Sequence, residues 1–228
     1  MSLPYSDLVD AAASLYAGTH ERQFARGKLR FDPVFSVLLS DGCLPDRGSL
    51  LDLGCGQGVL LALLAAARAR SGAAGLPPQL ALQGIEIDAS RAAAAQQALR
   101  GLASVTAGDI RDAAFPSSSG IVLLDVLLYL SDGDQRKVLE KACAALEPGG
   151  TLIVREADAA AGLAFRFTRW AERLLELKRG RWRDRLRYRS RAEWTGMLTG
   201  LGLAVVAEPM SAGTPFANVL YVCRKRDG

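Results

Sequence analysis

The sequence predicts an α/β protein built on a doubly wound, mainly parallel sheet with helices on both faces. Short apolar runs bounded by turn residues alternate along the chain with stretches of helical spacing, which is typical of βαβ units. The first apolar run leads directly into three closely spaced glycines and a long apolar helix, within residues 50–67. The chain has 228 residues and half of them are hydrophobic, so it can form one domain (1–228) around a single core.

Composition and cysteine usage exclude several classes of protein. No run of about 18 or more apolar residues occurs, and the first residues lack the basic and apolar regions of a signal peptide, so we expect a cytoplasmic protein without a transmembrane segment. The four cysteines are far apart and include no Cys-x-x-Cys pair, which argues against a disulfide framework and a structural zinc site. His20 is the single histidine, so any site that needs two histidines is excluded, and we expect no metal site.

The glycine-rich stretch after the first strand predicts a ligand-binding turn. Residues 50–58 are Leu-Leu-Asp-Leu-Gly-Cys-Gly-Gln-Gly, with Gly54, Gly56 and Gly58 at alternate positions. Glycines let the backbone turn sharply and let a ligand approach closely, and the helix that follows directs free N–H groups at the same place. A dinucleotide-binding turn would need its third glycine one position later, where Val59 stands. A tight turn that binds nothing is the alternative.

Acidic residues follow the next two predicted strands. The second strand, 80–87, has Glu86 near its end, and a carboxylate there can accept hydrogen bonds from both hydroxyls of a ribose. Asp88 is the expected cap of the next helix. A weaker third strand, 102–106, is followed by Asp109, whose side chain can serve a ligand or form an Asx-turn.

Together these stretches resemble the class I S-adenosylmethionine-dependent methyltransferases. Residues 50–58 match motif I of that family, hydrophobic-Asp/Glu-x-Gly-x-Gly-x-Gly, and 84–88 (Gly-Ile-Glu-Ile-Asp) match its second motif. Residues 146–152 (Leu-Glu-Pro-Gly-Gly-Thr-Leu) are similar to the Leu-x-Pro-Gly-Gly turn of the family. The resemblance covers roughly residues 45–156. It implies a seven-stranded sheet of order 3-2-1-4-5-7-6 with the last strand antiparallel, S-adenosyl-L-methionine as cofactor, and S-adenosyl-L-homocysteine as product.

The resemblance also implies a cofactor site. Glu86 would bind the ribose, Asp109 would accept from the adenine amino group, and the backbone N–H of Ile110 would meet a ring nitrogen. Arg26 or Lys28 could face the methionine carboxylate, with solvated surface charge as the alternative. The remaining expected cofactor ligands lie around the ends of the first and fourth strands: Asp52, Gly54, Gly56, Gly58 and Asp125.

A helical cap precedes the first strand in this interpretation. Residues 5–17 have the spacing of an amphipathic helix, and a polar, basic stretch with aromatic residues follows at 20–30. Asp32 and the proline after it are expected to open a short helix that continues to Leu39. We interpret 1–40 as a cap over the amino-acid end of the cofactor.

The chain after the fifth strand departs from the minimal fold. Residues 157–189 are rich in arginine and aromatic residues, and we interpret them as a basic helical insertion or lid. A capping box of Ser190 and Glu193 is expected to open the last helix, and 203–210 with 216–224 alternate as an antiparallel hairpin.

Three side chains near the expected mouth of the site are candidates for catalysis. In-line methyl transfer requires an acceptor held close to the sulfonium carbon, and for some acceptors a base. Glu156, at the end of the fifth strand, could act as that base, and Tyr129 could line the acceptor pocket or simply pack. His20 has a suitable ordinary pKa, although a lone histidine in a polar stretch is more often a surface residue.

Three functions fit the sequence. The first is methyl transfer to an O, N or C atom of a small molecule of secondary metabolism, which an acidic carrier protein could present. Residues 155–158 and 209–218 are similar to small methyltransferases of bacterial aryl-polyene pigment clusters. The second is methyl transfer to RNA or another nucleic acid through the basic segment 160–191, although no Asn/Asp-Pro-Pro-Tyr/Phe tetrad follows the fourth strand. The third is a non-catalytic role, either as a cofactor-binding protein or as a membrane-surface protein that uses the basic amphipathic helix at anionic lipid.

Overall fold

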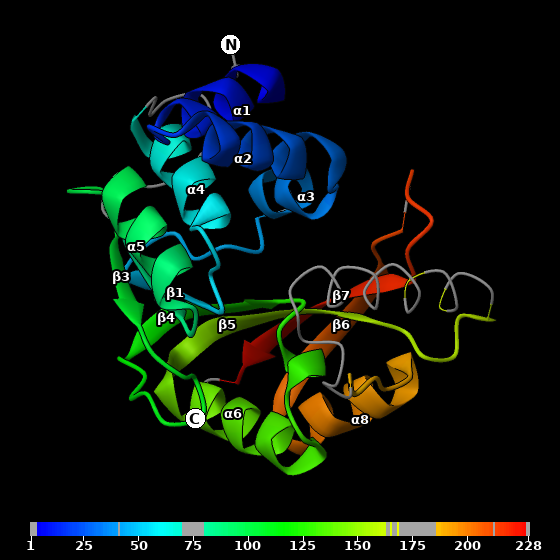
Figure 1. Ribbon diagram of the computed structural model, residues 1–228. Coiled ribbons are helices and arrows are strands. Elements are labelled where there is room, and N and C mark those ends of the chain that lie inside the picture. The colour runs from blue at the N-terminus through cyan, green and yellow to red at the C-terminus, as the bar shows by residue number, and fades with distance from the viewer. Residues whose placement is uncertain are drawn as a thin grey trace.

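The computed structural model describes residues 4–40, 42–69, 80–162, 165, 168, 186–211 and 213–226. In this part of the chain, the strands form one seven-stranded sheet of order β3-β2-β1-β4-β5-β7-β6 (Figure 1). The strands are β1 (Ser49–Leu53), β2 (Ala81–Glu86), β3 (Ser104–Ala107), β4 (Ser118–Leu124), β5 (Leu146–Ala157), β6 (Leu203–Pro209) and β7 (Asn218–Lys225). β7 runs antiparallel to both of its neighbours, and the other pairs are parallel. The predicted fold, strand order and antiparallel last strand are confirmed.

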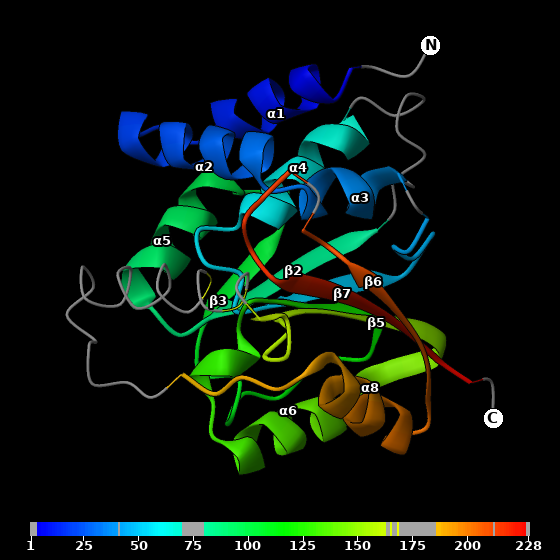
Figure 2. The ribbon, with the colours of Figure 1, turned by 90° about the vertical axis from the view of Figure 1, so that its right-hand side faces the viewer.

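Helices cover both faces of the sheet, as the sequence predicts (Figures 1 and 2). One face carries α1 (Tyr5–Ser14), α2 (Thr19–Phe31), α3 (Val34–Ser40), α4 (Val59–Ala69) and α5 (Ala89–Ala98). The other face carries α6 (Asp132–Ala145), α8 (Arg191–Gly200) and the short 3-10 helix η1 (Leu127–Tyr129) that follows β4. A separate hydrophobic cluster lies on each face.

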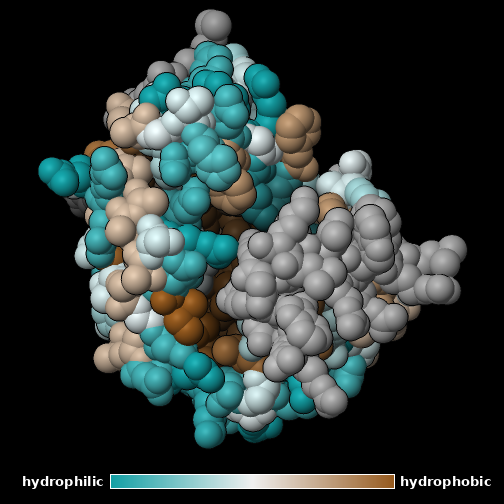
Figure 3. All heavy atoms as spheres, in the orientation of Figure 1, coloured by the Kyte–Doolittle hydropathy of each residue, from teal (hydrophilic) through white to brown (hydrophobic). Residues whose placement is uncertain are grey.

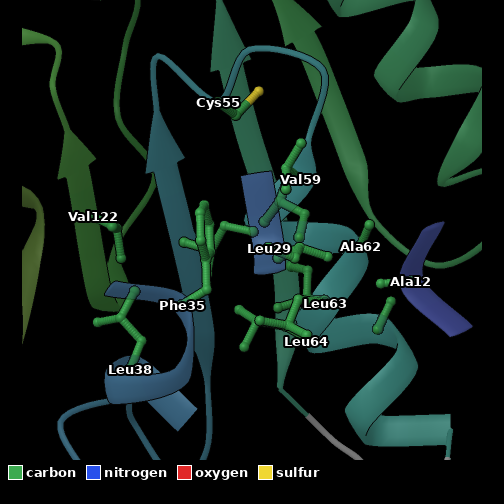
Figure 4. Packing of buried hydrophobic residues seen from close by; sticks show 14 of the residues in the cluster. Ala12, Leu29, Phe35, Leu38, Cys55, Val59, Ala62, Leu63, Leu64 and Val122 are labelled. Atoms are coloured by element: carbon green, nitrogen blue, oxygen red, sulfur yellow. The ribbon is translucent and has the colours of Figure 1, made fainter. Parts of the chain in front are cut away.

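The two central strands are apolar because they are buried on both faces. Successive side chains of a strand point to opposite faces, so Leu50 joins the cluster beneath α4 and Leu51 joins the cluster beneath α6. In the first cluster, side chains of the N-terminal helices gather with Leu63 and Leu64 of α4 against the sheet (Figure 4). The N-terminal helices are therefore part of the main core.

The polar stretch 20–30 forms helix α2, which the sequence analysis did not assign. Ala25 and Leu29 are buried against the first cluster, and a narrow apolar stripe of this kind is enough to dock an otherwise polar helix. The preceding helix α1 ends at Ser14, earlier than the expected residue 17.

The ends of two central strands have irregular features. β5 begins at Leu146, because Leu146 pairs with Ser118 on the far side of a register shift in β4. β4 ends at Leu124, and the apolar residues after it form η1.

Local signals near the other helices are confirmed. The Asp88 side chain accepts hydrogen bonds from the backbone N–H groups at the start of α5, and Ser190 with Glu193 forms the capping box of α8. The predicted hairpin is β6 and β7. Most of the predicted insertion 157–189 lies outside the described residues, so the lid stays a prediction. Within the described ranges, no helix is long and apolar enough to cross a membrane.

Candidate functional site

The glycine turn lies between the end of β1 and the start of α4. All three glycines have positive φ, at 75° for Gly54, 59° for Gly56 and 76° for Gly58. A Cβ atom on Gly54 would lie 2.6 Å from the Cγ2 atom of Val126, and one on Gly58 would lie 2.8 Å from the Cδ1 atom of Leu99. A Cβ atom on Gly56 would meet nothing within 4 Å. The outer glycines are thus required by packing, whereas the middle glycine borders open space that a ligand can reach.

Glu86 connects the end of β2 to this turn. Its Oε2 atom accepts a hydrogen bond from the backbone N–H of Gly56 at 2.8 Å, and its Oε1 atom accepts one from the N–H of Asp88 at 2.9 Å. The side chain is only 5% exposed. Since each carboxylate oxygen has more than one acceptor position, Glu86 keeps capacity for further donors beside the middle glycine.

Asp52 places a second buried carboxyl group beside Glu86. It lies on β1, in register with Gly84 of β2, and is 4% exposed. Burial and the negative charge of Glu86 raise the pKa of Asp52 to about 7. No ion pair to either acid occurs among the residues that the structure describes. The pair of buried acids, Asp52 and Glu86, therefore favours a positively charged partner.

Tyr16 closes one side of the turn. Its hydroxyl group donates a hydrogen bond to the carbonyl oxygen of Gln57 at 2.9 Å, and burial raises its pKa well above the ordinary value.

The segment that begins at Tyr16 borders a hollow of about 160 Å³ between the α1–α2 connection and α5. Ile87, directly after Glu86, is 59% exposed. Figure 3 shows hydrophobic atoms in a hollow below the N-terminal helices.

Asp109 and Ile110 lie in the loop that follows β3. Arg111 binds both carboxylate oxygens of Asp109 through its Nε atom, at 3.0 and 2.9 Å, and this contact lowers the pKa of Asp109. The backbone N–H of Arg111 also donates to Asp109 Oδ1 at 2.9 Å, which is the predicted Asx-turn geometry. Ile110 is 6% exposed. An arriving adenine amino group would share Asp109 with Arg111.

Lys141 of α6 contacts the loop that carries Asp109 and Ile110. Its Nζ atom donates to the carbonyl oxygens of Ile110 at 2.7 Å, Arg111 at 3.0 Å and Ala113 at 2.7 Å. The ammonium group also lies 4.2 Å from the centre of the Phe115 ring. Sequence reasoning did not identify Lys141, because a lysine on an amphipathic helix carries no sign of what it contacts.

Asp125 lies directly after β4 in a left-handed conformation, with φ at 57°. Its Oδ1 atom accepts from Arg155 Nε at 3.0 Å, and its Oδ2 atom pairs with the Nη2 atom of the same guanidinium group. Its backbone N–H donates to the Arg155 carbonyl oxygen at 3.0 Å. The side chain expected to bind cofactor is therefore held by an arginine of the neighbouring strand.

Lys28, a candidate for the methionine carboxylate, forms an ion pair with Asp32. The Nζ–Oδ2 distance is 3.2 Å, and the lysine side chain is 40% exposed. Arg26, the other candidate for the methionine carboxylate, pairs with Asp10 at 2.9 Å. Asp32, expected only as a helix cap, accepts from the backbone N–H of Val34 at 3.2 Å and also binds Arg155.

The three candidate catalytic residues lie on three different elements. Glu156 is 2% exposed, and its Oε1 atom accepts from the backbone N–H of Leu127 at 2.8 Å, so it supports η1 from inside the molecule. Burial raises the pKa of Glu156 well above its ordinary range. Tyr129, the last residue of η1, is partly buried. His20 is exposed near the start of α2, on the opposite face of the sheet.

Comparison with known proteins identifies the family of this chain. A family model described as a methyltransferase domain matches residues 20–208. The carboxy-S-adenosyl-L-methionine synthase of Chromohalobacter salexigens is 33% identical over 125 residues, which are 52% of this chain and 43% of that protein. The chain thus matches less than half the length of this relative.

Solved structures share the fold at low sequence identity. An O-methyltransferase family protein from Burkholderia thailandensis has a TM-score of 0.67 and 19% identity, covering 96% of this chain and 64% of that one. The magnesium protoporphyrin IX methyltransferase of Synechocystis with bound SAH has a TM-score of 0.61 and 18% identity, covering 90% of this chain and 86% of that one.

Proposed function

Because the chain belongs to the class I S-adenosylmethionine-dependent methyltransferase family and has S-adenosylmethionine as its cofactor, we propose that it transfers the cofactor's methyl group to a small molecule. The observation that carries this proposal is the pair of buried acids, Asp52 and Glu86, beside the open middle glycine of the turn. The methylated atom is an oxygen, nitrogen or carbon of the acceptor.

The charge of the crevice suits a sulfonium cofactor. S-Adenosylmethionine carries a positive sulfonium and a positive ammonium group, and a buried carboxylate that lacks a cation gains most from such a partner. A dinucleotide would bring a negatively charged pyrophosphate to the glycine turn, where the carboxylate of Asp52 would repel it. An acid at the position of Glu86 also binds the ribose of dinucleotides, so Asp52 and the glycine spacing are the features that disfavour a dinucleotide.

We assign the parts of the cofactor to the strand ends in order. Glu86 accepts the ribose hydroxyls, Asp109 and the Ile110 backbone bind the adenine, and Gly54, Gly56 and Gly58 pass beneath the amino-acid end. Asp52 and Asp125 complete the expected ligands, and Lys28 reaches the methionine carboxylate only if it releases Asp32.

The catalytic contribution is mainly orientation of the acceptor. We propose that Tyr129 lines the acceptor pocket on η1, and that Glu156 fixes η1 through the Leu127 N–H. A carboxyl group held in this way is poorly placed to take a proton from an acceptor. His20 stays a candidate base, although its exposed side chain on α2 is less constrained than that of Glu156.

A small acceptor is favoured over a nucleic acid by two features. One structural relative is named for magnesium protoporphyrin IX, a small ring system. The basic charge that suggested nucleic acid is partly neutralised where it can be described, since Arg189 donates to Asp132 at 3.1 Å and to Gln135 at 2.8 Å. An acidic carrier protein that presents the acceptor remains part of the proposal.

Calorimetric titration with S-adenosylmethionine, S-adenosylhomocysteine and NAD tests the cofactor assignment. We expect the first two to bind and NAD to show no heat of binding. Incubation with cofactor labelled on its methyl group, plus separate small-molecule and RNA fractions of a cell extract, tests the acceptor. Label in the small-molecule fraction supports the proposal, whereas label only in RNA supports the nucleic-acid alternative. Absence of binding by both cofactor forms would overturn the function.

A further inference from the structure

Arg155 is a charged residue near the carboxyl end of the buried strand β5. Its side chain is 1% exposed, and the neighbouring strand residues are buried as well. Burying a guanidinium group is costly unless every donor direction is satisfied by good partners. In this protein two carboxylates accept from all three of its nitrogen atoms, Asp125 from Nε and Nη2 and Asp32 from Nη1 at 2.5 Å.

The contacts of Arg155 with Asp125 and Asp32 form a bridge between two parts of the chain. On the Asp125 side, the bridge holds the segment that faces the glycine turn. Asp125 has the only positive φ of a non-glycine residue in the described ranges, and the Arg155 side chain and carbonyl oxygen both hold it there. The next residue, Val126, is the one that would collide with a side chain at Gly54. A shift of Asp125 would therefore move the wall that contacts the turn directly.

The other side of the bridge controls the helical cap. Asp32 lies where α2 ends and α3 begins, and it accepts from the first backbone N–H of α3. Lys28 of α2 binds its second oxygen, and the Tyr5 hydroxyl of α1 donates to the Leu29 carbonyl oxygen at 2.9 Å. The Asp32 carboxylate thus connects α2 and α3 to the guanidinium group, across 123 residues of sequence, and the Tyr5 hydroxyl joins α1 to α2.

We propose that Arg155 is a positioning residue for methyl transfer, which holds Asp125 against the glycine turn and fixes α1–α3 relative to it. The guanidinium group is suited to this role because its planar fork binds one carboxylate at two points and still has a donor for another. Lysine offers a point charge and cannot reproduce this geometry. The role rests on the proposed function, since Asp125 is assigned to the cofactor site.

Two variants test the bridge from different sides. Arg155→Lys keeps the charge and removes the fork, and Asp32→Asn weakens the cap side while it leaves the pair with Asp125 intact. The matched control is Asp7→Asn, which removes an exposed charge of α1 and leaves Arg26, Lys28 and Arg155 with their partners. For Arg155→Lys we expect about tenfold weaker binding of S-adenosylmethionine, measured well below the melting temperature, and unchanged binding for the control. Asp32→Asn also releases Lys28 toward the cofactor, so for this variant the deciding measurement is hydrogen exchange.

Amide hydrogen exchange supplies the readout that a merely structural role would not move. In folded Asp32→Asn without cofactor, we expect faster exchange in 125–128 as well as in 5–38, with α6 and α8 unchanged. If Arg155→Lys does not fold, Asp32→Asn alone decides. Wild-type affinity of Arg155→Lys, or unchanged exchange in 125–128 of Asp32→Asn, would overturn the positioning role, even if the melting temperature fell. A wild-type protein that binds no S-adenosylmethionine would instead refute the proposed function.

Discussion

Glu86 shows how one side chain can prepare a site before any ligand arrives. Its carboxylate already binds the N–H groups of Gly56 and Asp88, so the end of β2 and the turn after β1 are held at a fixed separation. If these groups receive the cofactor as proposed, they are preorganised for it, which reduces the free energy lost on ordering them.

The first prediction concerns the charge of Glu86. Glu86→Ala should weaken S-adenosylmethionine binding at least about tenfold, because a charged acceptor for two hydroxyl groups contributes roughly 1.5–3 kcal/mol. Glu86→Gln, which keeps one acceptor oxygen, should bind with an intermediate affinity. Titration calorimetry gives the affinities. Glu140→Ala, which removes an exposed glutamate of α6, serves as control and should bind normally. Equal affinities for all four proteins would contradict the ribose assignment.

The second prediction concerns the pH dependence produced by Asp52. Its pKa is raised to about 7 in the folded protein, against about 3.9 in an unfolded chain, so the folded state binds this proton more tightly. The stabilisation from that proton is complete below pH 4 and is lost as the pH rises through 7. Asp52→Asn should therefore gain stability relative to wild type between pH 5 and 8. Urea unfolding of the two cofactor-free proteins at pH 5 and at pH 8 measures the difference in their free energies of unfolding. The same difference at both pH values would refute the assignment.

At the scale of elements, patterns that are local in sequence predicted local structure well. The alternation of apolar runs and helical spacing located the strands, because each depends on which faces are buried. The cap of Asp88 and the capping box of Ser190 were predictable, since both involve residues two or three positions apart. Helix α2 was missed because its polar composition conceals the short buried stripe of Ala25 and Leu29.

Long-range polar contacts could not be predicted in the same way. The acids at the strand ends could be assigned to one crevice, since parallel strands bring their carboxyl ends together. The partners of those acids could not, because Arg155 reaches Asp32 across 123 residues and Lys141 reaches the loop after β3 across about 30. The partner of Glu156 could not be predicted either: alternation along β5 turns its side chain to the face opposite Arg155, where it accepts from the Leu127 N–H.

The third prediction concerns how α6 supports the adenine loop. Lys141→Met removes three hydrogen bonds to the carbonyl oxygens of Ile110, Arg111 and Ala113 while keeping the length of the side chain. We expect about three- to tenfold weaker cofactor binding, since the backbone proposed to meet the adenine loses three hydrogen bonds from a charged donor. Titration calorimetry measures it. Lys137→Met, on the exposed side of the same helix, should have no effect, and an identical result for both would contradict this role.

On the scale of the whole molecule, the cap is built into the larger fold. Leu8, Val9, Tyr16 and Phe35 belong to the same buried cluster as α4 and the central strands. Residues 5–40 therefore cannot swing away from the glycine turn without exposing a large part of this cluster. The N-terminal helices and the sheet share one core.

The fourth prediction follows from this shared core. Leu8→Ala should destabilise the whole domain by about 2–5 kcal/mol, because the side chain is 4% exposed and its removal leaves a cavity between α1 and the sheet cluster. Thermal unfolding should keep a single transition at a lower temperature, since the cap and the sheet share one core. Phe24→Ala, at a 46% exposed position on α2, should change stability by less than about 1 kcal/mol. A second, earlier transition confined to α1–α3 in Leu8→Ala would mean that the cap unfolds independently, and the coupling through Asp32 and Arg155 would then have to work without a common core.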